Sequence, residues 1–336
     1  MSGDLDGGRM TAGVKQLLAE VLPDRRIADI GEVHGGRISD VFGVRFVDGS
    51  EPAIVKVYPS EERWKRAKEL DIYELLDRHG VAPIPEIWHS EAASVHLDAR
   101  PCTVMTMMEG VPLSTVAGAM AEHELFDVYR QMGELLASVH AISMDAFGYI
   151  TTEILDPATT NAEYILGSVE RHLEQYATRG GSQSLWSALG RHFADHASLF
   201  DLCKRPALCH NDFHENNVLV TRRDGSRWSI SGLIDMETAI AADPVSDVAK
   251  TDWFAIRGSR TKVDGLIAGL GGESALGPSL PERLALYRQY HELEMWGFFD
   301  HIGSASERDE MTAELRKAVT RGGIRLARPS SARRSR

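Results

Sequence analysis

The spacing of hydrophobic and polar positions changes about one third of the way along the chain. Up to residue 108, short apolar runs are separated by turn residues, which predicts strands near 27–34, 40–47, 52–58, 86–90 and 101–108. Two helices are expected beside them, at 12–22 and 61–79, and the second has one apolar face and ends at Gly80.

From about residue 122 the apolar spacing becomes mostly helical. Helices are expected at 122–142, 160–178, 183–199, 280–302 and 307–321. Two strand-like pieces interrupt them, at 217–221 and 228–235. A sheet-rich first third followed by a helix-rich remainder predicts an α+β chain of two lobes with a hinge near 106–112.

Length and composition narrow the class of protein. The chain has 336 residues, of which 43% are hydrophobic, so it can bury the cores of two lobes. Its apolar runs are short and broken by charges, which predicts no membrane-spanning helix, and its N-terminus lacks an export signal. Cys102, Cys203 and Cys209 form no CxxC pair or disulfide framework, so we expect a cytoplasmic protein.

The net charge of -12 argues against general nucleic-acid binding, which needs a basic surface. It fits a cationic substrate, although many proteins carry such a charge for solubility alone. The end of the chain is a local exception, with six arginines between Arg321 and Arg336. We expect this basic end to be solvated and disordered.

A short polar stretch carries the chemistry. His210-Asn-Asp-Phe-His-Glu-Asn-Asn has the spacing H-x-D-x-x-x-x-N of a kinase catalytic loop, and Asp235 ends a later apolar strand. Phosphoryl transfer needs a carboxylate that orients the acceptor hydroxyl and oxygen ligands that hold magnesium. Asp212 is expected in the first role, and Asn217 and Asp235 in the second.

Two other interpretations of this stretch stay open. His210, Asp212 and His214 alternate as a zinc or iron triad would on a strand, and the stretch is also compatible with a polar surface loop. The segment after Asn217 predicts a β-hairpin that brings Asn217 and Asp235 together at its base. Glu237 is either a further acid beside the metal or the start of a helix.

In these residues the chain resembles the aminoglycoside phosphotransferase and choline-kinase-like small-molecule kinases. The resemblance rests on the stretch from His210 to Val220, on Leu233-Ile-Asp-Met-Glu, and on Ala242-Asp-Pro-Val-Ser-Asp-Val-Ala, where Ala242 stands in place of the usual Gly. It implies a bilobal, protein-kinase-like fold with a small antiparallel sheet lobe at 1–106, a larger mainly helical lobe at 107–325 and a basic tail at 326–336. His210 and Asp247 would support the catalytic loop structurally; without the resemblance, Asp247 is a helix-cap acid.

The resemblance also implies a nucleotide site for ATP or GTP in the first lobe. Lys56, alone in an apolar strand, would grip phosphates and pair with Glu69, with Glu62 and Glu74 as other candidates; alternatively it is an edge-strand lysine that faces water. In the loop 34–40, Ser39 would contact phosphates, although Asp40 replaces the usual Asn. Backbone groups from Thr106 to Met108 would bind the adenine edge.

The acceptor is expected to be a small molecule. Asp243 follows Asp235 by only eight residues, which leaves no room for the activation segment of a protein kinase. Substrate candidates lie on the helix at 282–302, namely Glu292, Glu294 and Trp296, with Asp252 and Trp253 as second choices; the alternative is an amphipathic core helix.

Together these features predict a Mg2+-dependent phosphotransferase that moves the γ-phosphate of ATP or GTP to a hydroxyl of an aminoglycoside or related sugar-containing antibiotic. Its partner would be that small acceptor, with no nucleic acid and no membrane, and the oligomeric state is left open. Alternative functions are a kinase of choline, homoserine, methylthioribose, a nucleoside or a sugar, and a nucleotide-binding regulator without catalysis.

Overall fold

The computed structural model describes residues 3–33, 39–222, 225 and 227–320, which form two compact units. The first unit comprises Met1–Thr115, Thr151–Glu153 and Asn216–Glu237, and the second comprises Val116–Ile150, Ile154–Glu215 and Thr238–Arg336. The chain therefore returns to the first unit with the segment Asn216–Glu237, about 100 residues after Thr115. Most of the loop 34–40 and the whole basic end from residue 321 lie outside the described residues.

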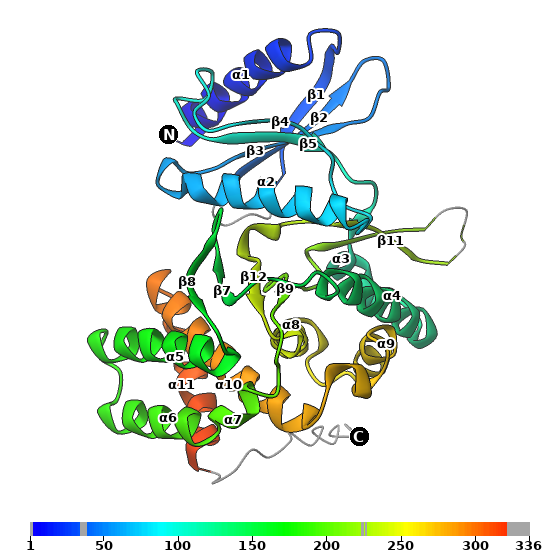
Figure 1. Ribbon diagram of the computed structural model, residues 1–336. Helices are drawn as coiled ribbons and strands as arrows, with labels where there is room; N and C mark the ends of the chain where they lie inside the picture. Colours follow the sequence, from blue (N-terminus) through cyan, green and yellow to red (C-terminus); the bar gives the residue numbers. More distant parts are fainter. Residues whose placement is uncertain (1–2, 34–38, 223–224, 226, 321–336) are drawn as a thin grey trace, which may run out of the picture. The chain divides into compact units, whose positions relative to one another are not determined.

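The first unit is built around a five-stranded antiparallel sheet with the strand order β1-β2-β3-β5-β4 (Figure 1). Its strands are β1 (Ile27–Glu32), β2 (Asp40–Phe46), β3 (Ala53–Val57), β4 (Ile87–Glu91) and β5 (Cys102–Thr106). All five lie where the sequence predicted strands. Short apolar runs bounded by turns were therefore sufficient to locate this sheet.

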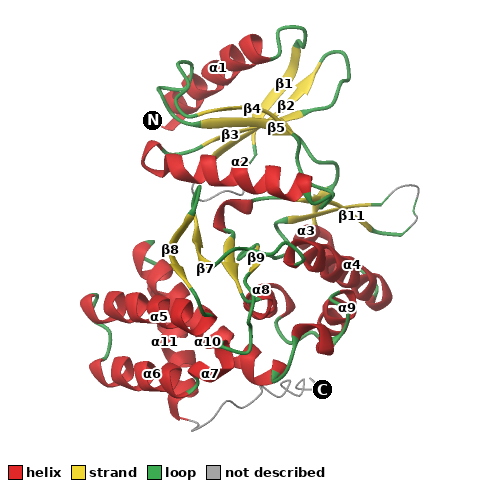
Figure 2. Ribbon diagram, viewed as in Figure 1, coloured by secondary structure: helices red, strands yellow, loops and turns green. Residues whose placement is uncertain are grey.

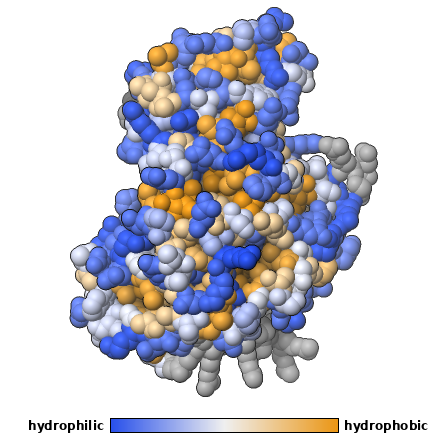
Figure 3. Space-filling model, viewed as in Figure 1, coloured by the Kyte–Doolittle hydropathy of each residue, from blue (hydrophilic) through white to orange (hydrophobic). Residues whose placement is uncertain are grey.

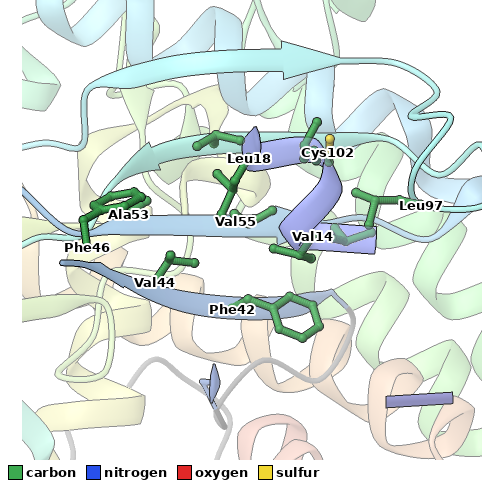
Figure 4. Packing of buried hydrophobic residues seen from close by; sticks show 12 residues of the cluster. Val14, Leu18, Phe42, Val44, Phe46, Ala53, Val55, Leu97 and Cys102 are labelled. Carbon is green, nitrogen blue, oxygen red and sulfur yellow. The ribbon is translucent and has the colours of Figure 1, made fainter. Parts of the chain in front are cut away.

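One face of the sheet is covered by α1 (Gly3–Val21), which begins earlier than the predicted helix. Val14 and Leu18 of this helix pack with Val55 and other buried residues of β2, β3 and β5, as Figure 4 shows. Ala53, Val55 and Val57 of β3 share this core. Because side chains alternate along a strand, Lys56 lies on the opposite face of the sheet.

The helix α2 (Arg63–Arg78) lies on that opposite face and follows a short 3-10 turn, Ser60–Glu62. It buries Glu69, Tyr73 and Leu76, on the face that the sequence predicted to be apolar. The helix ends where expected, because Gly80 adopts a φ of 68°, a left-handed conformation that glycine adopts without steric cost.

A second, three-stranded sheet completes the first unit, with the order β11-β10-β6. Its strands are β6 (Val111–Pro112), β10 (Val218–Thr221) and β11 (Ser229–Leu233). β10 and β11 form the predicted hairpin, in which Val218 lies opposite Leu233. Gly110, just before β6, has a φ of 109°, and a Cβ atom there would approach the Val220 carbonyl oxygen to 2.5 Å, so only glycine fits.

The second unit is mainly helical, as the red ribbons in Figure 2 show. Its longer helices are α4 (Glu122–His140), α5 (Asn161–Thr178), α6 (Gln183–Asp195), α8 (Pro244–Thr251), α9 (Arg260–Gly269), α10 (Leu280–His301) and α11 (Ala305–Thr320). Short helices are α3 (Leu113–Val116), at the junction of the two units in the chain, and α7 (Ala197–Phe200). α10 packs against α5, α8 and α11, so it is buried on several sides.

A small four-stranded sheet in the second unit has the order β8-β7-β12-β9. The strands are β7 (Phe147–Ile150), β8 (Ile154–Ala158), β9 (Ala207–Cys209) and β12 (Ile240–Ala242). β9 runs directly into His210, and β12 runs directly into Asp243 and α8. β9 and β12 pair antiparallel, with Cys209 opposite Ile240 and Ala207 opposite Ala242, so the polar loop (residues 210–217) begins at the end of the sheet where β12 starts. α8 follows the other end of β12 and packs against β9.

These observations confirm the predicted α+β class, with an antiparallel sheet in the first unit and a helical second unit. They also correct the details of several elements. The predicted helix 183–199 is two helices, α6 and α7, separated by His196. The strands β7, β8, β9 and β12 of the four-stranded sheet were not predicted, because strands of three to five residues carry too few positions for a periodicity to show. The helices α8 and α9 were not predicted either.

No helix within the described ranges is both long and apolar enough to cross a membrane. On the face drawn in Figure 3, hydrophilic residues prevail and hydrophobic areas lie scattered between them. Individual exposed apolar side chains, such as Val47 and Phe126, are common on protein surfaces.

Candidate active site

The candidate site in the first unit is organised around Lys56 of β3. Its ammonium nitrogen lies 2.9 Å from Glu69 Oε2, 3.0 Å from Asp235 Oδ1 and 3.1 Å from Glu237 Oε2. The Tyr58 hydroxyl donates a 2.6 Å hydrogen bond to the same Glu69 oxygen. The Lys56 side chain is only 10% exposed, so a charge there requires such partners. Lys56 is therefore not the edge-strand lysine that the sequence left open.

The carboxylates decide the ionisation of Lys56. Burial alone disfavours the charged ammonium, but the negative charges of Asp235, Glu69 and Glu237 outweigh it and raise the pKa of Lys56 well above its ordinary value. Lys56 is thus a permanent cation within a cluster of acids.

Of the three acids that the sequence offered as partners for Lys56, the structure brings Glu69 to it. Glu62 instead lies 2.7 Å from Lys65, its neighbour on the helix. Glu74 accepts a hydrogen bond through its backbone carbonyl from Arg78. Glu69 takes the central position because it lies on the buried face of α2, which packs on the Lys56 side of the sheet.

The hairpin brings the two predicted metal ligands to the same end of β10 and β11. Asn217 immediately precedes β10, and its carbonyl oxygen accepts a 3.0 Å hydrogen bond from the Ile234 N–H, one residue before Asp235. Asp235 has a φ of 66°, and its own N–H donates to the Tyr73 hydroxyl at 3.1 Å. Non-glycine residues rarely adopt this left-handed conformation, and they often do so at functional sites.

The predicted adenine-binding segment follows β5. The Thr106 N–H donates to the Glu86 carbonyl, and the Met107 N–H donates to the Pro52 carbonyl. Both donors are therefore already bonded inside the protein, so Thr106 can offer a base only its carbonyl oxygen. The Met108 N–H has no hydrogen-bond partner among the described residues and remains available as a donor.

A cavity of about 940 Å³ lies beside this segment in the first unit. Met107, Met108 and Gly110 line one side of it, and Ser229 and Ser231 of β11 line another. Lys56, Asn217 and Asp235 are not among the residues that line it, so this cavity is not the space around the Lys56 cluster.

The predicted phosphate loop is only partly described, since residues 34–38 lie outside the described ranges. The Ser39 hydroxyl oxygen is buried and has no hydrogen-bond partner among the described residues. Asp40, which departs from the family pattern, lies 2.7 Å from Arg100. That ion pair offsets the negative charge that would otherwise repel a phosphate.

The polar loop of the second unit is held by Asp247 of α8. One carboxylate oxygen accepts the His210 N–H at 2.8 Å, and the other accepts the Asn211 N–H at 2.7 Å. His140 Nε2 lies 3.0 Å from the first of these oxygens. Burial disfavours the anion, but His140, His210 and the Asn211 N–H outweigh it and lower the pKa of Asp247. His140 was not predicted, because no sequence pattern links it to a residue 107 positions away.

Asp212 lies next in this loop and is only partly buried. Its Oδ1 lies 3.4 Å from His214 Nε2. Burial disfavours the Asp212 anion, but His214, Lys250 and His210 favour it more strongly, so the pKa of Asp212 is lowered. The group is therefore anionic at neutral pH, as a carboxylate that accepts a hydrogen bond from a hydroxyl must be.

The metal triad that the sequence left open does not form. Within the described ranges, the ligand atoms of His210, Asp212 and His214 do not gather as a metal site requires; those of His140, Cys209 and Asp247 do. In that buried group, Asp247 already accepts three hydrogen bonds. Asp247 and His140 therefore support the loop structurally, and His210, Asp212 and His214 do not form the alternative metal triad.

The predicted substrate residues on α10 already have partners inside the second unit. Glu292 is 3% exposed and accepts a 3.1 Å hydrogen bond from Arg288, while Trp296 donates to Thr312 and packs edge-on against a tyrosine. Glu294 lies 3.2 Å from the Lys250 ammonium. Glu292 and Trp296 therefore belong to the packed interior, and their predicted contact with a substrate stays a prediction.

The fold and these two clusters together define a kinase-like phosphotransferase. The chain matches the model of the phosphotransferase enzyme family over residues 29–287 and belongs to that family. As an enzyme it is a small-molecule kinase. No curated protein sequence matches it at a significant level.

Solved structures with the same fold include aminoglycoside phosphotransferase APH(4)-Ia, at 19% identity over 93% of this chain and 99% of that chain, with a TM-score of 0.67. A thermostable mutant of that enzyme, in ternary complex with ADP and hygromycin B, matches at 20% identity over 92% and 99%, with a TM-score of 0.68. A proposed fructosamine-3-kinase from Thermobifida fusca matches at 19% identity over 91% and 99%, with a TM-score of 0.64. At such identities the likeness establishes the fold.

Proposed function

We propose that this protein is a Mg2+-dependent kinase that transfers the γ-phosphate of ATP or GTP to a hydroxyl group of a small amino-sugar compound, with aminoglycosides as the first class to test. One observation carries the proposal. In the first unit, a buried lysine suited to phosphate, Lys56, lies 3.0 Å from the carboxylate of Asp235, which is suited to magnesium. A kinase needs these two groups side by side on the nucleotide phosphates.

The residues at the base of the hairpin fit a magnesium ion. Mg2+ prefers oxygen ligands and is held in kinases by a carboxylate and few other protein groups. Asp235 and the amide oxygen of Asn217 would hold it, with Glu237 close to Lys56 in the same cluster. When bound, the metal would neutralise charge on the nucleotide phosphates.

Three groups of the first unit would bind the nucleotide. Lys56, kept charged and oriented by Glu69, would grip the phosphates, and Ser39 would add a hydroxyl contact. The Thr106 carbonyl and the Met108 N–H would bind the base. Related folds support a nucleotide, since one neighbour structure contains AMP-PNP and another, an aminoglycoside 2'-phosphotransferase, is a GDP complex.

Asp212 would orient the acceptor hydroxyl and accept its proton. Its lowered pKa keeps it anionic, and His214 at 3.4 Å steadies the side chain. The acceptor class is suggested by the neighbours, because hygromycin B is bound in the APH(4)-Ia complex and another protein is described as a proposed fructosamine-3-kinase. The net charge of -12 would attract a cationic amino sugar.

The test is acceptor-dependent turnover. The purified full chain is incubated with Mg-ATP or Mg-GTP and a panel that includes hygromycin B, gentamicin-type aminoglycosides, fructosamines, choline, homoserine, methylthioribose, nucleosides and simple sugars. We expect turnover with an amino sugar, abolished by EDTA and by Asp212→Ala. Turnover with choline or another metabolite instead would change the acceptor class but keep the kinase.

Two outcomes contradict the proposal. Mg-nucleotide binding without turnover of any acceptor would favour a regulator, and no Mg-nucleotide binding at all would exclude the kinase assignment.

Phosphorylation of an aminoglycoside would point to antibiotic resistance. The three cysteines are free, which fits a reducing compartment such as the cytoplasm.

A further inference from the structure

One face of α8 contacts the polar loop at three points. Asp247, Lys250 and Thr251 are spaced i, i+3 and i+4, which places them on the same side of a helix. Asp247 accepts the N–H groups of His210 and Asn211, as described above. The Thr251 hydroxyl donates a 2.7 Å hydrogen bond to the Phe213 carbonyl oxygen. Residues on both sides of Asp212 are therefore fixed by this one helix.

Lys250 provides the remaining contact of this face. Its ammonium nitrogen lies 3.4 Å from Asn211 Oδ1 and 3.2 Å from Glu294 Oε2, and the residue is only 7% exposed. The other end of the Asn211 amide donates to the Thr238 carbonyl oxygen at 3.3 Å. The Asn211 side chain is thus held at both ends, and Lys250 holds one of them.

Asn211 is a residue whose side chain can determine the position of Asp212. It has a φ of 59°, and asparagine is among the residues that tolerate this left-handed conformation. In the loop spacing H-x-D it is the x, directly before Asp212. A shift of its amide would be transmitted to the Asp212 carboxylate through a single peptide unit.

Two residues of α10 support Lys250: Glu294 contacts its ammonium group, and His291 contacts Glu294. His291 is fully buried, and its Nδ1 lies 3.1 Å from Glu294 Oε2, while its Nε2 lies 3.2 Å from the Ser246 hydroxyl. The same Nε2 also lies 3.1 Å from the Ser246 carbonyl oxygen, so the ring is held between Glu294 and Ser246. Burial disfavours the Glu294 anion, but the Lys250 and His291 contacts outweigh it and lower the pKa of Glu294, so Glu294 stays anionic.

We infer that Lys250 is a positioning residue that orients Asp212 through the side chain of Asn211. Glu294 of α10 anchors the Lys250 ammonium. This inference rests on the proposed function, since it assigns Asp212 to the acceptor hydroxyl. It also gives Glu294 a role other than contact with the substrate. Lys250 does not need to touch the acceptor or the nucleotide.

The first experiment is a double-mutant cycle in the full chain. Lys250→Met removes the charge, and Asn211→Gly removes the amide while keeping a residue that accepts a positive φ. We expect each single variant to lower kcat by about tenfold, with an unchanged KM for the nucleotide, because small misplacements of a reacting group have effects of this size. If Lys250 acts through Asn211, the double variant loses no more than the worse single variant.

The control variant is Lys317→Met. Lys317 is also a helical lysine paired with a glutamate, Glu314, but it is 52% exposed and lies on α11. We expect wild-type kcat from it, and Lys250→Arg should restore most of the loss seen in Lys250→Met. A kcat within twofold of wild type in Lys250→Met overturns the inference. Losses that multiply in the double variant also overturn it.

A second measurement does not depend on any acceptor. The groups that favour the Asp212 anion are His214, Lys250 and His210, so the loss of one cation raises the pKa of Asp212. Carboxyl 13C NMR titration should show a higher Asp212 pKa in Lys250→Met than in wild type or Lys317→Met, and an unchanged pKa would contradict the inference. If no acceptor is turned over, the proposed function fails while this titration still tests Lys250.

Discussion

Asp247 accepts hydrogen bonds from the backbone N–H groups of His210 and Asn211, at 2.8 and 2.7 Å, across 37 and 36 positions of the chain. One buried carboxylate thereby fixes the backbone that carries Asp212. The contact forms because α8 follows β12 and packs against β9, which brings Asp247 to the backbone just beyond β9.

Replacing this carboxylate should affect both stability and activity. Asp247→Asn loses the charge that binds two N–H groups and His140, so we expect a loss of about 2–4 kcal/mol in the free energy of unfolding. kcat should fall because Asp212 is less well held. Urea unfolding and turnover measure the two effects, and Asp264→Asn, at a partly exposed residue of α9, serves as the control.

The same carboxylate should also give the protein a pH dependence of stability at low pH. The pKa of Asp247 is lowered in the folded protein, so the unfolded chain binds its proton first as the pH falls. Its stabilising effect is thus present above the unfolded pKa of about 3.9 and is lost as the pH falls through the folded value. As the pH falls, the free energy of unfolding should decrease less steeply in Asp247→Asn than in wild type. An equal decrease with pH in the two proteins would show that Asp247 is not the source of this dependence.

Asp212→Asn should separate catalysis from folding. The side chain is partly exposed and its contact with His214 is long, so we expect the free energy of unfolding to change by less than about 1 kcal/mol. Loss of the carboxylate that accepts the hydroxyl proton should lower kcat by about 10²-fold or more. Thermal unfolding and turnover with the best acceptor of the panel test this, and a variant with near wild-type kcat would exclude Asp212 from the chemistry.

Lys56→Met should weaken nucleotide binding and destabilise the first unit. It leaves Glu69, Asp235 and Glu237 close together without their shared cation, and breaking such a buried cluster typically costs about 3–5 kcal/mol. Glu69→Gln keeps the shape and should have a smaller effect on stability. Calorimetric titration with Mg-ATP measures binding, and added Mg2+ should stabilise Lys56→Met more than wild type, because it substitutes for the lost charge.

The free energy of unfolding should fall as the pH rises, because the buried Glu292 loses its proton less readily than it does in the unfolded chain. Burial raises its pKa to about 7, against the attraction of Arg288. Below the unfolded pKa of about 4.3 both states are protonated, and between that value and 7 only the unfolded chain releases the proton. Wild type should therefore lose up to about 3 kcal/mol of stability over this window, and Glu292→Gln should not. Urea unfolding at pH 5 and pH 8 provides the comparison.

The residues of the loop and of the first sheet could be found in the sequence because each is marked locally. The strands are apolar runs between turns, and Lys56 stands out as a charge inside one of them. The spacing from His210 to Asn217 and the hairpin to Asp235 are likewise readable within 26 residues. Such short-range patterns reflect the backbone geometry of one strand or one turn.

Other features could not be read in this way. The partners Glu292–Arg288 and Glu294–His291 lie on one helix, yet the sequence could not show whether that helix faces solvent or the interior. Thus the acids of α10 were equally suited to bind a substrate or to pair internally. The predicted lobe limits at residues 106 and 325 also remain predictions.

The sequence by itself determined the chemistry that this protein offers: an acid at 212, two oxygen ligands at 217 and 235, and a lysine in an apolar strand. These follow from residue type and local spacing. Only the tertiary structure decided which charges meet, because Lys56 reaches Asp235 across 179 positions and His140 reaches Asp247 across 107. Such contacts depend on how strands and helices pack, and packing leaves no local pattern in the chain.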